Sequence, residues 1–281
     1  MRKGCSMSGK PGTSSWTLHL LLVAGGLFVA VPLLWMVVTS LKGQLAALAF
    51  PPSLLPHPVH WDNYAEVFRQ IPLARYFLNT AFVAGVTVLG VLVTSTLAAY
   101  ALSFFWFKGS RLAFLLILGT MMVPPPAYLV PGYRLLSGLG WVDTYWALII
   151  PWIANAFAIF LLRQHMKTIP RALYDSARLE GASDLAFLVR VVLPLSKPVL
   201  AAAGLFAFLG SWNSFIWPLA MTERESLRVL QVGLAYFSTE ASAQWPLLMA
   251  GSTLAILPVV FIYLLAQKQI VATFQETGLG G

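Results

Sequence analysis

Six stretches of the chain contain no Asp, Glu, Lys or Arg, and their length constrains the fold more than any other feature of the sequence. Each is at least nineteen residues long and mostly apolar. They cover residues 11–41, 76–107, 112–133, 144–162, 198–222 and 241–267. About 20 apolar residues let a helix cross the hydrocarbon core of a bilayer, and a helix satisfies its own backbone hydrogen bonds there. We therefore predict an all-α integral membrane protein with six transmembrane helices.

Composition supports lipid as the solvent of this chain. Only 10% of its residues are charged and its mean hydropathy is +0.77, whereas soluble domains are about 25% charged. Residues 43–61 also lack charges but hold four prolines, so we predict a loop there. The apolar run 16–40 is longer than a signal-peptide core, which favours a retained helix. The lone cysteine, Cys5, excludes a disulfide within the chain.

Lysine and arginine placement predicts the orientation. With the N-terminus inside, the inner segments hold twelve of the 18 basic residues. We thus expect a cytoplasmic tail at 1–15, a six-helix membrane domain at 16–267 with an inner loop at 163–197, and a cytoplasmic tail at 268–281. The basic residues are spread over four inner segments, so the net charge of +8 indicates membrane orientation rather than a nucleic-acid partner.

Prolines predict breaks within several helices. The second helix is expected at 77–103, and the third at 113–129, where Pro124, Pro125 and Pro126 interrupt it. The fourth, 145–162, contains Pro151, and the sixth, 246–267, contains Pro258. The fifth is expected at 199–219, and a short surface helix at 62–68.

The inner loop reads as a helix, a glycine turn and a second helix. Residues 171–180 are good helix formers, and Gly181 can supply a left-handed closing residue. Ser183 can cap the second helix, which Pro194 ends. Two interpretations fit: a basic loop lying on lipid headgroups, or a helix that docks into a partner protein. The first leaves the acids Asp175, Glu180 and Asp184 without a role.

This segment, "IPRALYDSARLEGASDLAFLVRVVLPLSKP", resembles the cytoplasmic coupling motif of permease subunits of bacterial binding-protein-dependent ABC importers. The family pattern has Glu-Ala-Ala, an acid before a glycine, and a later proline. The matching positions here, expected to couple to the ATPase, are Asp175, Ser176, Ala177, Glu180, Gly181, Ala182 and Pro194. Asp replaces Glu, Ser replaces Ala and Glu replaces Asp, so charge and small size are kept.

Further segments are similar to carbohydrate permeases of the maltose-transporter type. They are "RYFLNT", "MMVPPPAYLVPGYRLL", "IFLLRQHMKTIP", "GSWNSFIWPL" and "QWPLLMAGSTLAILPVVFIYLLAQK", so the likeness runs from about residue 41 onward. Ser214 stands where the family usually has an acid. The resemblance implies a permease core of spans two to six in the bacterial inner membrane. It implies as partners ABC ATPase subunits, a second homologous permease subunit, an extracytoplasmic solute-binding protein and a carbohydrate or related solute.

The chain carries no recognisable catalytic motif. It has no G-x-x-x-x-G-K-[ST] loop, so we expect ATP hydrolysis on a separate chain. H-E-x-x-H and G-x-S-x-G are also missing, and His57, His60 and His165 lack metal-ligand spacing. We expect no catalytic residue, metal or cofactor. An ion-coupled secondary transporter is the alternative, because spans broken by proline can coordinate ions. No carboxylate relay lies in the spans to support it.

Four side chains are candidates for the solute pathway. Trp212 and Asn213 lie roughly 20 Å from the inner end of the fifth helix, just past the membrane midplane. An indole ring stacks on sugar faces, and an amide bonds sugar hydroxyls. Asn155 and Asn79 are similar candidates in the fourth and second helices. Packing between helices is the alternative role for all four.

Overall fold

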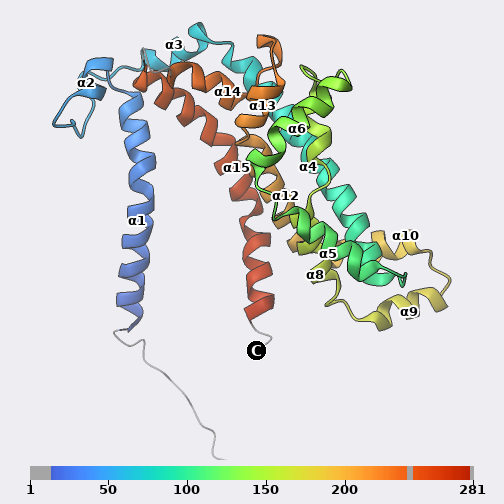
Figure 1. Cartoon of the computed structure of the whole chain (residues 1–281). Coiled ribbons are helices and arrows are strands. Elements are labelled where there is room, and N and C mark those ends of the chain that lie inside the picture. Colours follow the sequence, from blue (N-terminus) through green and yellow to red (C-terminus); the bar gives the residue numbers. More distant parts are fainter. Residues whose placement is uncertain (1–13, 239–242, 279–281) are drawn as a thin grey trace, which may run out of the picture. The chain divides into compact units, whose positions relative to one another are not determined.

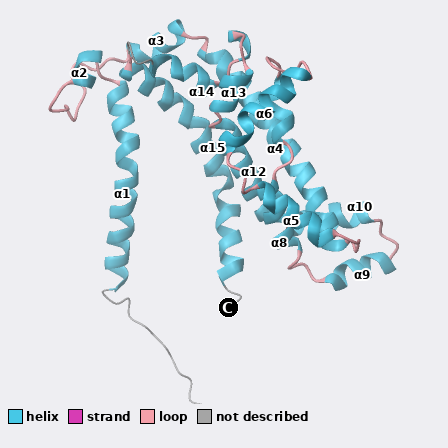
Figure 2. Cartoon of the chain, viewed as in Figure 1, coloured by secondary structure: helices cyan, strands magenta, loops and turns pink. Residues whose placement is uncertain are grey.

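The computed structural model describes residues 14–238 and 243–278. Within these ranges the chain consists of helices and connecting loops, without strands (Figure 2). It divides into two units, Met1–Val67 with Phe237–Leu254, and Phe68–Tyr236 with Ala255–Gly281. Cys5 and most of the predicted N-terminal tail lie outside the described residues. The all-α prediction is confirmed.

The first unit contains α1 (Ser14–Ser40) and the short α2 (Gln44–Leu48). It also holds most of α3 (Asp62–Gln70), which matches the surface helix expected at 62–68. Between Trp16 and Ser40, the most apolar window of α1 (the blue helix in Figure 1) has none of its residues buried within the protein. A helix that is apolar on every side and unburied is suited to lipid contact.

The second unit is built on α4 (Leu73–Phe104), which packs against α8 (Ala156–Met166) and α12 (Lys197–Trp212). Val91, Ala158 and Ala203 form a buried cluster where these three helices meet. Small side chains allow membrane helices to approach closely, and van der Waals packing then holds them together. The second membrane helix, which the sequence predicted to start at residue 77, is α4 and begins four residues earlier, at Leu73.

The third and fourth spans are broken at the prolines, as the sequence predicted. α5 (Ser110–Thr120) and α6 (Pro125–Gly138) meet at 98° across the residues before Pro125. α7 (Tyr145–Ile149) passes into a 3-10 turn, η1 (Ile150–Trp152), before α8 begins. Proline lacks an N–H and clashes with the preceding turn, so neither segment continues as one straight helix.

The prediction of a continuous fifth helix over residues 199–219 is wrong. α12 ends at Trp212, and α13 (Ile216–Met221) begins after a break. The reason is Pro218, whose ring would clash with the carbonyl of Ser214 in an unbroken helix. The chain continues through η3 (Glu225–Leu227), α14 (Leu230–Leu234) and η4 (Ala235–Ser238) to α15 (Trp245–Gly278). The break predicted at Pro258 is wrong, because the last helix continues through Pro258 and runs past its predicted end at residue 267.

The inner loop has the predicted helix, glycine turn and helix. α9 (Arg171–Leu179) is followed by α10 (Asp184–Phe187), a π-helical turn, η2 (Leu188–Val192), and α11 (Leu193–Leu195). Together Asp184–Leu195 forms one arm that meets α12 at 81°. Ser183 accepts a hydrogen bond from the N–H of Ala186, as expected for its capping role.

Span counting gives between four and six membrane crossings in the described residues. Four segments qualify alone by length and hydropathy, and two bent helix pairs qualify if each pair is one span. The single segments are Trp16–Ser40, Leu73–Phe104, Tyr145–Met166 and Trp245–Lys268. The six spans predicted from the sequence correspond to the upper count.

Candidate functional site

The turn at Gly181 closes α9 with two backbone hydrogen bonds. The N–H of Ala182 donates to the carbonyl of Ala177 at 2.9 Å, and that of Gly181 donates to Arg178 at 3.1 Å. Gly181 has φ +82°, a left-handed value at which a Cβ costs about 1–2 kcal/mol. This pattern is the Schellman motif, which satisfies the last helix carbonyls and reverses the chain sharply.

An aromatic cluster holds α9 and α10 against the end of α4. Phe104 of α4 lies 5.7 Å from Tyr174 of α9 and 5.4 Å from Phe187 of α10, between ring centroids. Tyr174 and Phe187 are themselves 5.2 Å apart in an edge-to-face arrangement, and Tyr100 joins the cluster through Phe104. Such pairs contribute about 0.5–1.5 kcal/mol each beyond the area they bury.

Asp184 provides the polar part of the same attachment. Its carboxylate accepts a 2.8 Å hydrogen bond from the Tyr174 hydroxyl and lies 3.6 Å from the guanidinium of Arg178. Its backbone carbonyl accepts from the Tyr100 hydroxyl at 3.1 Å. The hydrogen bond to Asp184 raises the pKa of Tyr174, and burial acts in the same direction. Tyr174 therefore stays a neutral donor across the physiological range.

The opposite side of α9 faces away from this cluster. Asp175, Ser176, Glu180 and Gly181 are all exposed there, while Ala182 is half-buried and Ala177 packs against the buried cluster that includes Phe104 and Phe187. Pro194 is exposed on α11. The structure thus brings together the six candidates from Asp175 to Ala182 and places Pro194 apart from them, on the following arm. Leu179, which sequence reasoning missed, is 90% exposed beside the turn.

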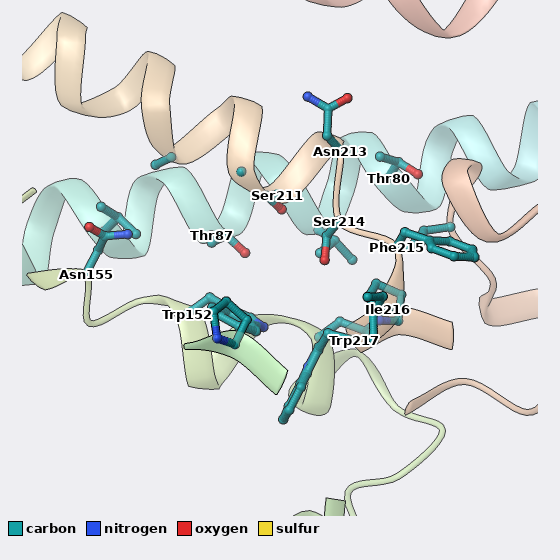
Figure 3. Close-up of a pocket in the computed structure, with 18 of the residues that line it drawn as sticks. Thr80, Thr87, Trp152, Asn155, Ser211, Asn213, Ser214, Phe215, Ile216 and Trp217 are labelled. Atoms are coloured by element: carbon teal, nitrogen blue, oxygen red, sulfur yellow. The ribbon is translucent and has the colours of Figure 1, made fainter. Parts of the chain in front are cut away.

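A second feature is a cavity of about 720 Å³ within the second unit (Figure 3). α4, α6, η1, α12 and α13 contribute to its wall. Its polar side chains are Thr80, Thr87, Tyr128, Asn155, Ser211, Asn213 and Ser214, and its indole rings belong to Trp152 and Trp217. The two indole rings are perpendicular, with centroids 5.4 Å apart. Aromatic faces beside hydroxyl and amide groups can contact both the apolar and the polar sides of a sugar.

Two of the four pathway candidates lie at this cavity. Asn155 caps α8 by accepting a hydrogen bond from the N–H of Ala158 at 2.9 Å, and its side chain lies on the cavity wall (Figure 3). Asn213 also borders the cavity, but its amide donates to the carbonyl of Leu209 and its side chain points away from Trp152 and Trp217 (Figure 3).

The other two candidates do not line the cavity. Trp212 is 2% exposed, and its indole N–H donates to the carbonyl of Ala255 at 3.0 Å. Asn79 donates to the carbonyls of Ser226 and Arg228, both at 2.9 Å, and accepts from the Tyr145 hydroxyl. In this structure both side chains serve the packing role that the sequence left open.

Sequence reasoning missed several side chains on the cavity wall. Thr87 is 3% exposed, and its hydroxyl has no hydrogen-bond partner among the described residues. Trp217 donates to the carbonyl of Ala147, and its ring occupies space left by Gly132, where a Cβ would lie 2.8 Å from the indole. The run "GSWNSFIWPL" contained part of this information, because it interleaves polar and aromatic residues.

No group of three or more metal-ligating side chains occurs within the described parts of the chain.

Comparison with known proteins identifies the family to which this chain belongs. Residues 14–274 match the family described as binding-protein-dependent transport system inner membrane component. The chain belongs to this family. It is a permease subunit of an ABC importer, a transport subunit rather than an enzyme, and it works with a solute-binding protein. The ion-coupled secondary transporter is not favoured.

Individual relatives agree with this assignment. The chain is 31% identical to the arabinooligosaccharides transport system permease AraQ of Bacillus subtilis, over 94% of this chain and 95% of that protein. It is 33% identical to the sn-glycerol-3-phosphate permease UgpE of Rhizobium meliloti, over 92% and 95%. A solved bacterial ABC transporter involved in import of the polysaccharide alginate is similar at a TM-score of 0.78 and 25% identity. That match covers 94% of this permease and all of the other chain.

Proposed function

We propose that this permease moves a carbohydrate or a related solute, such as a sugar, polyol or glycerol phosphate, across the bacterial inner membrane by alternating access. The relatives named for arabino-oligosaccharides and glycerol 3-phosphate support this class of solute. The cavity supports it chemically, because Trp152 and Trp217 offer ring faces while Asn155, Thr87 and Ser214 offer hydrogen-bonding groups. The solute contacts would be made by these five side chains.

The observation that carries the mechanism is the exposed face of α9. The opposite face of this helix is attached to α4 and α10 by the aromatic cluster and by Asp184. Asp175 and Glu180 are exposed and can form charge pairs, while the small exposed residues Ser176 and Gly181 leave room for close approach. An ABC ATPase subunit would grip this helix and move it as a rigid body when nucleotide binds. The grip can bias the two states only by contacting the helix differently in each.

The helix that receives this motion also lines the cavity. On α4, Thr87 lies on the cavity wall, and Tyr100 lies in the aromatic cluster about 20 Å further along the helix. α12 lines the same cavity through Ser211 and follows directly on the arm that contains α10. Displacing α9 would therefore shift two walls of the cavity together.

The assembly we propose contains this chain, a second homologous permease subunit and two ATPase subunits, with the solute-binding protein on the outside. Both termini would lie in the cytoplasm, which the excess of basic residues in the inner segments supports. The membrane domain would span residues 16–267, with coupling through 163–197.

Reconstitution tests this proposal. The tagged chain should co-purify with an ATPase and a second permease. Mass spectrometry of the solute bound to the co-isolated binding protein then identifies that solute. In proteoliposomes the complex should accumulate that labelled solute only with ATP and the binding protein. Uphill uptake by this chain alone, driven by an ion gradient, would overturn the proposal.

A further inference from the structure

The loop between α1 and α3 exposes large apolar side chains that nothing in the first unit covers. Leu45 is 88% exposed, Phe50 96%, Leu54 77% and Leu55 76%. Residues 43–61 contain no Asp, Glu, Lys or Arg. Exposed apolar patches of this kind mark a surface that contacts a partner or a membrane. We call residues 45–55 the apolar loop.

A buried lysine ties the middle of the apolar loop to the end of α1. Lys42 is 2% exposed, and its Nζ donates to the carbonyl of Ser53 at 2.6 Å. The same ammonium lies 4.3 Å from the centre of the Trp35 ring, in the last turns of α1. The carbonyl of Lys42 in turn accepts from the Asn63 amide at 2.9 Å. Ser53 is thus held beside α1, and the loop does not extend freely from the helix.

This attachment sets the depth of the loop relative to a bilayer. Trp16–Ser40 is 25 residues long, or roughly 37 Å at 1.5 Å per residue, against a hydrocarbon core of about 30 Å. The last turn of α1 therefore reaches the headgroup region, where Trp and Lys side chains are favoured. Figure 1 shows α2 and the loop that follows it near the C-terminal end of α1.

We propose that the apolar loop inserts Phe50, Leu54 and Leu55 into the headgroup and upper acyl region of the leaflet at the Ser40 end of α1. The loop would act as an interfacial anchor that fixes the depth and tilt of α1. Amphipathic and apolar segments bind this region through buried apolar area. The anchor requires no particular solute and goes beyond the transport function proposed above.

Lipid fits this loop better than a protein partner does. Protein interfaces surround an apolar centre with a polar rim, and charged groups fix their register. The apolar loop has no charge, and the surface continuous with it is α1, whose most apolar window has no buried residue. That window is long and apolar enough to cross a membrane, and the hydrogen bond from Lys42 holds the loop beside its end.

Site-specific fluorescence tests the proposal on the complete transporter. After Cys5→Ser, a single cysteine is introduced by Phe50→Cys or Leu54→Cys and labelled with the fluorophore NBD. The purified complex is placed in phosphatidylcholine nanodiscs with or without doxyl-labelled phosphatidylcholine. Emission should be blue-shifted, quenched by doxyl lipid and protected from iodide.

Two label positions calibrate these readings. Leu27→Cys, on the exposed centre of α1, should be quenched by doxyl lipid, and Glu223→Cys, on an exposed polar loop, should be quenched only by iodide. Labels at 50 and 54 that behave like the Glu223 label would overturn the proposal. Protection from both quenchers would also overturn it, because a protein would then cover the loop.

A charge variant separates insertion from mere proximity. Leu54→Asp with Leu55→Asp should abolish doxyl quenching of the label at position 50, because carboxylates resist transfer into hydrocarbon. Leu54→Val with Leu55→Val is the matched apolar control and should retain quenching. Co-purification of the partner subunits reports that both variants are assembled. Unchanged quenching in the aspartate variant would show that the apolar side chains do not drive insertion.

Discussion

The hydroxyl of Tyr174 donates a 2.8 Å hydrogen bond to the carboxylate of Asp184, joining the two helices on either side of the Gly181 turn. The turn alone fixes how the chain reverses direction, and this bond fixes the angle between α9 and the following arm. Because the Tyr174 ring also packs on Phe104, the same side chain attaches both helices to α4.

Tyr174→Phe should weaken coupling while keeping the fold. The ring contacts remain, and the lost hydrogen bond is worth about 0.5–1.5 kcal/mol. We expect a lower ratio of solute transported to ATP hydrolysed, measured on the reconstituted complex. Tyr133→Phe, which removes a hydroxyl on α6 away from the cluster, is the control. An unchanged ratio in Tyr174→Phe would contradict a mechanical role for this bond.

Gly181→Ala should impair transport without preventing membrane insertion. No atom lies within 4 Å of the added Cβ, so the cost is the left-handed backbone, about 1–2 kcal/mol. Gly109 has φ +89° and equally open surroundings, but it lies between α4 and α5. Gly109→Ala therefore carries the same backbone penalty outside the proposed coupling segment. Equal transport loss in both variants would indicate a general stability effect.

Asn155→Ser should alter solute affinity while preserving the helix cap. Serine caps helices about as well as asparagine, but it lacks the amide N–H₂ that Asn155 presents on the cavity wall. We expect a raised KM for uptake with unchanged thermal stability. Asn155→Ala loses both functions and should also destabilise the protein, by about 1 kcal/mol. A KM that stays constant in the serine variant would remove Asn155 from the pathway.

Asn79→Ala should lower the stability of the protein rather than its affinity for the solute. It removes the bonds to Ser226 and Arg228 and leaves the Tyr145 hydroxyl without its acceptor. Each buried group left unpaired costs about 1–3 kcal/mol. Thermal unfolding should shift downward, and Tyr145→Phe should reproduce part of the shift. A change in KM with normal stability would instead return Asn79 to the solute pathway.

Because of the contact between Asp143 and Arg224, the thermal stability of the protein should fall at acidic pH. Burial raises the pKa of Asp143, but hydrogen bonds from Arg224 and from the backbone of Glu223 outweigh it, so the pKa lies below its usual 3.8. The contribution is therefore complete above that value and is lost as pH falls through the lower folded-state pKa. Thermal unfolding in detergent across this range should show the loss, and Asp143→Asn should show a smaller pH dependence.

The glycine turn and the proline breaks of the third and fourth spans could be predicted because their causes are local, whereas Pro258 stays inside an unbroken helix. Gly181 and Ser183 act on backbone groups within a few residues, and Pro151 acts on its own preceding turn. Charge-free length predicts helices in lipid for the same reason, since each span satisfies its own hydrogen bonds. The break before Pro218 was equally local and was missed because the apolar run continued through it.

The cavity wall could not be predicted, because it depends on contacts between residues far apart in the chain. Asn79 and Asn155 are the same residue type in similar apolar surroundings, yet one is held by the 226–228 segment and the other reaches the cavity. Only tertiary packing decides which amide is already satisfied. The sequence by itself determined the membrane class, the breaks of the third and fourth spans, and the exposed helix with its glycine turn. The tertiary structure decided which polar groups remain free to bind, because a hydrogen bond formed within the protein removes that group from use.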